Sequence, residues 1–188
     1  MKTKTIRTGM IAALAALGLA GCGDPWQGEN KANPTIARVI AMDPNNLAAF
    51  DSTGSVQADK PDGTGVWQVT GLNYTNADGQ PAQASLLIVQ ANKLLNGASI
   101  QVSPTDCTPV AGAFTFTPAA PAGTTWYACY NPTSPNTDQG GSIMFYAGTD
   151  ALDPSSAQSF AEGTLVTITG TAKDHQGKSL AVDVQAQF

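Results

Sequence analysis

The fold is decided by the C-terminal stretch 164–188, which reads TLVTITGTAKDHQGKSLAVDVQAQF. Its first half alternates apolar and hydroxyl side chains, as expected of a strand with one buried face. A second alternating run begins at Leu180. Between the two runs, Asp174-His175-Gln176-Gly177 is polar and ends in glycine, which is typical of a turn. The stretch therefore predicts two antiparallel strands, 164–171 and 180–188, joined as a closing hairpin.

Upstream of this hairpin, short β-rich runs recur between turn sequences such as KPDG at 60–63 and NADG at 76–79. The apolar run 86–89 fits a buried strand or a helix by periodicity alone, but its shortness and the Asn-Gly pair at 96–97 favour a strand. About ten short strands separated by turns predict an all-β antiparallel sandwich. The expected strands are 34–42, 55–58, 66–75, 84–90, 98–103, 114–117, 124–130, 143–147, 164–171 and 180–188.

Two Asp-Pro pairs predict one or two short helices within this all-β fold. In both Asp43-Pro44 and Asp153-Pro154, the Asp suits a helix N-cap and the Pro suits the first helical position. We expect the first helical turn to run through Phe50. The second should end near Gly163, because glycine is common directly after a helix.

Two pieces of the chain resemble bacterial Ig-like domains of the type first recognised in S-layer proteins. One is FTFTP at 114–118; the other is GTLVTI at 163–168, followed by DHQGKSL at 174–180. The resemblance implies an Ig-like β-sandwich over 34–188 that serves as a spacer or binding module, and it transfers no functional residue. The sequence departs from the family at the inserted region 119–162, at Val166 in place of Tyr, and in a span above about 100 residues.

The N-terminus carries the pattern of a secretory signal peptide. Three basic residues precede an apolar run at 10–19 that is too short to span a bilayer. Leu19-Ala20-Gly21-Cys22 then resembles a bacterial lipobox, which implies cleavage after residue 21 and acylation of Cys22. The alternative is an ordinary signal peptide with an incidental cysteine. We therefore expect a signal peptide at 1–21, a lipidated flexible tether at 22–33 and one domain at 34–188.

The charge of the expected mature chain bears on its partners. The whole chain has nine Lys plus Arg and fourteen Asp plus Glu; removing the signal leaves six against fourteen, a net charge near −8. Such a surface repels nucleic acid and anionic headgroups, so membrane attachment should come from the lipid. Gly23 follows Cys22, whereas Asp there resembles an inner-membrane retention signal in enteric bacteria. We expect the outer membrane, at its periplasmic or surface face.

The two remaining cysteines predict a disulfide. Export places Cys107 and Cys129 in an oxidising compartment, and Cys22 is consumed by lipid. A zinc site is disfavoured, because two thiols and the distant His175 do not make a ligand set. We therefore expect no metal and no cofactor.

The aromatic stretch 124–130 is the candidate ligand-binding site. In a strand, Trp126, Ala128 and Tyr130 share one face, and Tyr127 and Cys129 share the other. One set should pack in the core, and the other is a candidate platform for a sugar ring or a protein partner. Burial of Trp126 and Tyr130 would favour packing; their exposure would favour the platform.

Other candidate chemistry finds little support in the sequence. Gly177-Lys178-Ser179 resembles the end of a phosphate loop, but Ala172 replaces the required glycine and no helix follows. His175 has no partner serine motif. Calcium ligation by Asp138, Asp150 and Asp153 is a minor alternative to solvated loop acids. We expect a non-catalytic, lipid-anchored envelope module, with a carbohydrate-binding module as the alternative and a small hydrolase as the third possibility.

Overall fold

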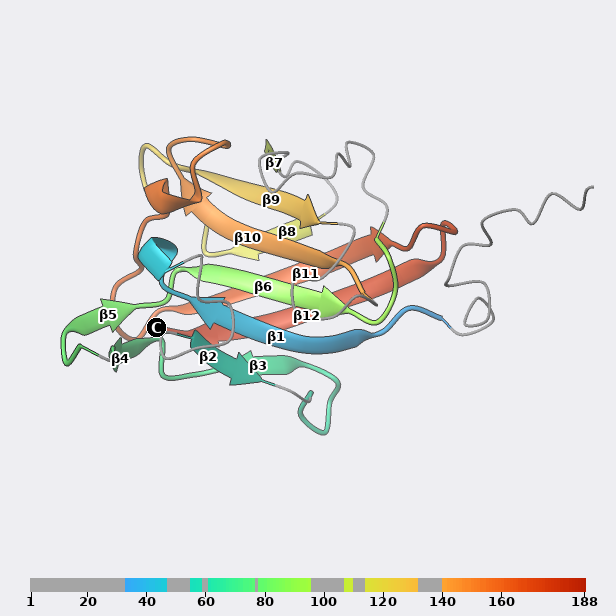
Figure 1. Ribbon diagram of the computed structural model, residues 1–188, viewed down its shortest axis with the longest axis horizontal. Helices are drawn as coiled ribbons and strands as arrows, with labels where there is room; N and C mark the ends of the chain where they lie inside the picture. Colours follow the sequence, from blue (N-terminus) through green and yellow to red (C-terminus); the bar gives the residue numbers. More distant parts are fainter. Residues whose placement is uncertain are drawn as a thin grey trace, which may run out of the picture.

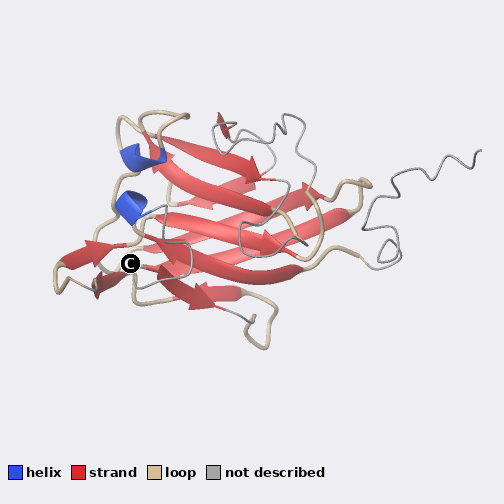
Figure 2. Cartoon of the chain, viewed as in Figure 1, coloured by secondary structure: helices blue, strands red, loops and turns tan. Residues whose placement is uncertain are grey.

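The computed structural model describes residues 33–46, 55–58, 61–76, 78–95, 107–109, 114–131 and 140–188. Strands dominate these residues, with two short 3-10 helices (Figure 2). The elements are β1 (Ile36–Met42), η2 (Pro44–Asn46), β2 (Ser55–Ala58), β3 (Trp67–Val69), β4 (Asn73–Thr75), β5 (Pro81–Gln83), β6 (Leu86–Ala91), β7 (Cys107–Pro109), β8 (Phe114–Thr117), β9 (Thr125–Asn131), β10 (Ser142–Gly148), η3 (Pro154–Ser156), β11 (Leu165–Lys173) and β12 (Ser179–Gln187).

The strands form two packed sheets and a small hairpin (Figure 1). The larger sheet has the order β2-β1-β6-β10-β9-β7, and the smaller has the order β3-β12-β11-β8. Strands β4 and β5 pair separately. All pairs are antiparallel except β3 with β12, which is parallel. The predicted all-β sandwich is confirmed.

The C-terminal hairpin is the longest strand pair, as its sequence predicts. Its register runs without interruption from Leu165 opposite Gln187 to Lys173 opposite Ser179. Along β12, burial alternates strictly, with Leu180, Val182, Val184 and Ala186 turned inward. This period of two places one apolar face of the hairpin against the larger sheet.

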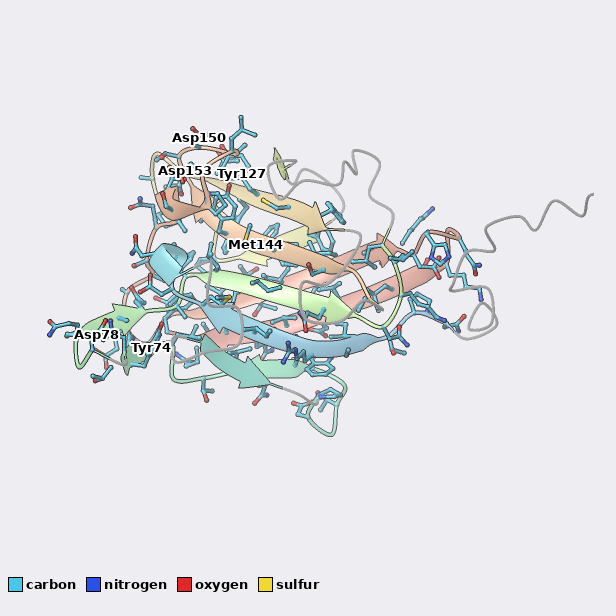
Figure 3. All side chains as sticks on the ribbon, in the orientation of Figure 1. Tyr74, Asp78, Tyr127, Met144, Asp150 and Asp153 are labelled. Atoms are coloured by element: carbon cyan, nitrogen blue, oxygen red, sulfur yellow. The ribbon has the colours of Figure 1, made fainter. Side chains whose placement is uncertain are left out.

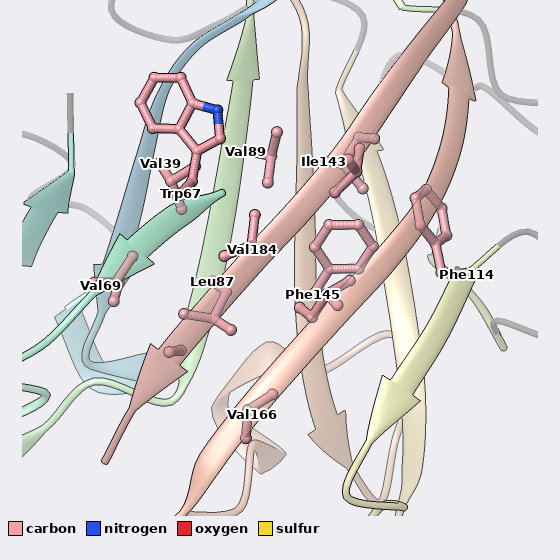
Figure 4. Close-up of a cluster of buried hydrophobic side chains, with 14 of the residues drawn as sticks. Val39, Trp67, Val69, Leu87, Val89, Phe114, Ile143, Phe145, Val166 and Val184 are labelled. Atoms are coloured by element: carbon pink, nitrogen blue, oxygen red, sulfur yellow. The ribbon is translucent and has the colours of Figure 1, made fainter. Parts of the chain in front are cut away.

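The space between the sheets is filled by one apolar core (Figure 4). It receives every second residue of the central strands, including Val39, Val89, Phe145 and Val184. Phe114 and Phe145 meet edge to face with ring centroids 4.9 Å apart, a favourable aromatic arrangement. Hydrophobic burial in this layer holds the two sheets together.

The outer face of the larger sheet is also buried. A second cluster there contains Ile40, Met42, Leu86, Ile88, Cys129 and Tyr146. Ala157, directly after η3, packs against it. Strand β6 is therefore buried on both faces, which explains why LLIV at 86–89 is a continuous apolar run rather than an alternating one.

The structure corrects several predicted boundaries. The strand expected at 66–75 is two strands, β3 and β4, interrupted at Gly71, whose φ of 74° suits glycine and breaks extended structure. Asp153 does cap η3, but that helix ends at Ser156 rather than near Gly163. Strands β5 and β7 were not expected. The strand expected at 98–103, the signal peptide expected at 1–21 and all but Asn33 of the tether expected at 22–33 lie outside the described residues.

The stretch 119–162 supplies two strands of the larger sheet. Strand β9 pairs with β10 over its whole length, and β10 pairs in turn with β6. This stretch separates FTFTP at 114–118 from GTLVTI at 163–168 in sequence, yet its strands carry part of the main core through Trp126, Ile143 and Phe145.

Candidate functional site in the aromatic strand

The predicted division of β9 into two faces is confirmed. Trp126 and Ala128 belong to the core between the sheets, and Tyr130 packs against it. Cys129 belongs to the outer cluster, with Tyr127 packed against that cluster. Because β9 is held between β10 and β7, both of its faces are set by the sheet.

Trp126 lies inside the sandwich, in a ladder of rings. Its indole stacks on Phe116, with centroids 4.4 Å apart and planes 13° apart, and on Phe160 at 5.6 Å and 18°. Phe160 in turn contacts Phe188 at 5.0 Å. Trp126 is only 7% exposed. Both faces of the indole are covered, so Trp126 offers no stacking surface to a sugar ring.

The indole nitrogen of Trp126 has an unusual environment. Nε1 is buried and has no hydrogen-bond partner among the residues that the structure describes. A buried N–H without an acceptor costs about 1–3 kcal/mol. Burial and stacking of the large ring must outweigh this cost, which supports a packing role for Trp126.

On the outer face, Tyr127 contacts Tyr146, with ring centroids 5.4 Å apart. The Tyr146 hydroxyl lies 3.0 Å from the backbone oxygens of both Asp150 and Ala151 and can donate to either. Desolvation, together with the nearby Tyr127 and acidic groups, raises the pKa of Tyr146 well above that of a free phenol. These contacts tie the loop after β10 to the sheet.

Tyr130 is half-buried on the core side of β9. Burial raises the pKa of its phenol. Tyr127 is also half-buried, but it points to the opposite face. The two tyrosines and Trp126 therefore do not form one shared aromatic platform.

The two cysteines face each other across a strand pair. Cys107 of β7 is the register partner of Cys129 of β9. Directly opposed residues of an antiparallel pair have Cα atoms about 4.5–5.5 Å apart, within the range that a disulfide requires. Cys129 is 3% exposed. The side chain of Cys107 lies outside the described residues, as does Cys22.

The turn between β11 and β12 is built around Asp174. This carboxylate is 1% exposed and accepts hydrogen bonds from the backbone nitrogens of Gln176, at 2.9 Å, and Lys178, at 2.8 Å. Gly177 has a φ of 80°. GKS at 177–179 therefore belongs to a hairpin turn rather than to a phosphate loop. His175 is fixed by its backbone N–H, which donates to Leu94 at 2.9 Å.

The loop acids considered as calcium ligands accept hydrogen bonds from the backbone of the turns in which they lie. Asp150 accepts a hydrogen bond from the backbone of Leu152, and Asp153 accepts one from the backbone of Ser155. Asp138 lies outside the described residues. Over the part of the chain that the structure describes, no three His, Cys, Asp or Glu side chains converge as ligands for a metal ion.

Sequence reasoning missed the partners of Trp126. Phe160, which stacks on Trp126, and Phe188, which contacts Phe160, lie far from the predicted aromatic strand in sequence. The alternation in FTFT at 114–117 was the available signal for Phe116, but alternation alone does not say which ring meets which. The buried Lys93, 2% exposed, was also not singled out.

Comparison of the chain with protein-family models, with curated proteins and with solved structures finds no match in any of the three. Within the described ranges, no helix has both the length and the apolar composition that crossing a membrane would require.

Proposed function

We propose that this chain is a lipid-anchored protein of the bacterial envelope whose Ig-like β-sandwich acts as a non-catalytic binding or structural module. The observation that carries the proposal is Leu19-Ala20-Gly21-Cys22, behind a basic segment and an apolar run. Several acyl chains on Cys22 would anchor the protein stably where one chain would not. Because Gly23 rather than Asp follows Cys22, the proposed address is the outer membrane.

The non-catalytic role is supported by what the candidate side chains do in the fold. Asp150, Asp153 and Asp174 accept backbone hydrogen bonds that shape their own turns. His175 lies in the hairpin turn, against Leu94. A hydrolytic site needs a nucleophile and a base within hydrogen-bond reach of each other.

The carbohydrate-binding alternative depends on Trp126, whose indole is buried. Sugar-stacking sites use an exposed aromatic face, whereas Trp126 is enclosed between Phe116 and Phe160. Any ligand of β9 would have to use the half-buried edges of Tyr127 or Tyr130, which lie on opposite faces. A protein or glycan partner bound elsewhere on the sandwich remains compatible with the proposal.

We also propose that Cys107 and Cys129 form a disulfide. Two observations support the pairing: the two residues are opposed in the β7–β9 register, and Cys129 is buried. The bond would fix β7, a strand of three residues at the edge of the larger sheet.

The anchor is tested by metabolic labelling with palmitate. Cys22→Ser should abolish the label and leave unprocessed precursor, while Gly23→Ser, which leaves the lipobox intact, should still incorporate label. Gly23→Asp should move the acylated protein from outer-membrane to inner-membrane fractions in an enteric host. Normal maturation of Cys22→Ser to a soluble product would refute the anchor.

The absence of catalysis is tested separately on the purified domain. Screens with ester, peptide, phosphate and glycoside substrates should show no turnover. Robust turnover that disappears on His175→Ala or Asp174→Asn, in protein that still folds, would refute the non-catalytic proposal.

A further inference from the structure

The charges of the described residues are segregated along the sandwich. All four Lys and Arg side chains in this part of the chain lie at the end that carries the β11–β12 turn; these are Arg38, Lys93, Lys173 and Lys178. The turn, the start of β1 and the end of β6 meet at that end (Figure 1). We call it the basic end.

Hydrogen bonds join the segments of the basic end. The backbone N–H of Thr35 donates to the Asn92 side chain at 2.9 Å, and the backbone N–H of Asn92 donates to the Thr35 carbonyl at 3.1 Å. Two residues on, the Leu94 carbonyl accepts from His175. The site where the chain enters the domain is thus bonded, through 92–94, to the turn that carries Lys173 and Lys178.

The individual cations differ in exposure. Lys173 is exposed, and Lys178 and Arg38 are half-buried. The Arg38 side chain donates to Gln90 on the neighbouring strand β6. Lys93 is buried. The acid in the turn, Asp174, is buried; its Oδ1 accepts hydrogen bonds from the backbone of Gln176 and Lys178, and its charge offsets one of the four cations.

The opposite end is acidic. Asp78, Asp150 and Asp153 lie there, as the labelled side chains in Figure 3 show. Asp43 ends β1 on that side, and Glu162 lies just before β11. Of the remaining two described acids, Asp183 lies in the middle of β12. Asp62 lies in the β2–β3 loop, which leaves β2 at Ala58, opposite Val39 and so on the side where β1 begins; it is the one described acid besides Asp174 on that side. The two ends are separated by the nine residues of β11, about 30 Å.

We propose that the basic end is the membrane-facing surface of the domain and that it contacts anionic lipid headgroups. The inference rests on the proposed lipid anchor, because the chain between Cys22 and Asn33 leads from the bilayer into this end. Even fully extended, that segment spans at most about 40 Å. The anchor therefore brings the four cations near the headgroups.

Screening explains how a chain of net negative charge does this. The Debye length at physiological ionic strength is about 8 Å. With the basic end on the membrane, the acidic end lies more than three such lengths from the headgroups. Its repulsion is then largely screened, while Lys173 and Lys178 lie within range. The net charge of the chain predicts that an anionic bilayer repels it, whereas the arrangement of its charges predicts which end of the domain faces the bilayer.

The test measures which end of the anchored domain touches the bilayer. A fluorophore is placed on Gln176→Cys, in the basic turn, or on Gln80→Cys, near the tip of the β4–β5 hairpin; both sites are exposed. The mature chain is held by an N-terminal polyhistidine tag in place of Cys22 on vesicles with nickel-chelating lipid. Vesicles of phosphatidylcholine, with or without phosphatidylglycerol, carry a headgroup nitroxide that quenches nearby label.

The expected result is strong quenching at position 176 only with phosphatidylglycerol, and weak quenching at position 80 in both vesicles. Lys173→Gln with Lys178→Gln should shift the ratio of orientations by about tenfold, since each cation near an anionic surface is worth up to about fivefold. The matched control, Gln80→Glu with Gln158→Glu, lowers net charge equally at the acidic end and should leave quenching unchanged. High salt should remove the effect.

Three outcomes would overturn the inference: equal quenching at position 176 in neutral and anionic vesicles, equal quenching at both label sites, or equal effects of the two double variants. Circular dichroism checks that each variant folds. The tag supplies the anchor artificially, so this test is independent of Cys22. Absence of palmitate label from the unmutated chain would instead refute the anchor, and the two failures are distinguishable.

Discussion

Replacing Trp126 by alanine should destabilise the domain by about 4 kcal/mol. A buried indole removes about 200 Å² from water, worth about 5 kcal/mol at 25 cal/mol per Å². Alanine recovers only a small part of this, and the two stacked contacts with Phe116 and Phe160 are lost. The value falls within the range of about 3–5 kcal/mol measured for Trp or Phe truncation in protein cores.

A companion variant, Trp126→Phe, isolates the ring from its nitrogen. Phenylalanine keeps a ring between Phe116 and Phe160 and removes the N–H that has no acceptor. Its smaller volume costs packing, but relief of the unsatisfied donor offsets about 1–3 kcal/mol of that cost. We therefore expect Trp126→Phe to lose less than half as much stability as Trp126→Ala.

Urea unfolding followed by circular dichroism measures both variants, because the signal does not depend on the removed tryptophan. For a domain of this size, 4 kcal/mol corresponds to a fall in Tm of about 8–16 °C. A loss below about 1 kcal/mol for Trp126→Ala would show that the indole does not fill the core. The packing argument would then fail, and the exposed-platform interpretation of β9 would return.

Three further predictions concern the disulfide, the phenol and the turn. Reducing the proposed Cys107–Cys129 bond, or replacing both cysteines by serine, should cost about 3 kcal/mol, because the bond closes a loop over the 21 intervening residues; two free thiols in non-reduced peptide mapping would contradict it. The pKa of Tyr146 in the folded state is raised above its unfolded value near 10, so the stability that its protonated phenol contributes is complete below pH 10 and is lost as pH rises further. Tyr146→Phe should weaken this loss of stability at alkaline pH, measured by urea unfolding at a series of pH values. Near neutral pH the same variant should cost about 1 kcal/mol, because the hydrogen bond of the hydroxyl is lost. Asp174→Ala leaves two backbone N–H groups without their acceptor and should cost about 2 kcal/mol in the same assay, whereas the control Asp183→Ala, within β12, should change stability by less than about 0.5 kcal/mol.

The hairpin at the C-terminus could be predicted because its signal is local. Alternation at 164–171 and 180–188 and the polar turn between them determine strand, face and register together. The same holds for the Asp153-Pro154 cap, whose hydrogen bond to Ser155 lies within the predicted turn. Patterns of this kind depend only on residues that are close in sequence, so they can be recognised in a single sequence.

Other features depend on which strands become neighbours in space. Alternation in β9 showed that Trp126 and Tyr127 face opposite ways, but not which face meets the second sheet. That choice follows from β9 lying beside β10 and from Phe160, which itself contacts Phe188, stacking on Trp126 from elsewhere in the chain. Similarly, β7 has three residues and no pattern of its own, and it is a strand because β9 supplies its pairing partner.

The placement of the cations has the same origin and cannot be predicted from composition. Arg38, Lys93, Lys173 and Lys178 are scattered through the sequence, and no run of basic residues marks them. Antiparallel pairing brings them together: β1 begins where β6 ends, and β11 ends where β12 begins. A mature net charge near −8 predicts repulsion from anionic lipid only if the charge is spread evenly. Because this topology collects the cations where the chain enters from its N-terminal side, the anchor would determine which charges the membrane meets.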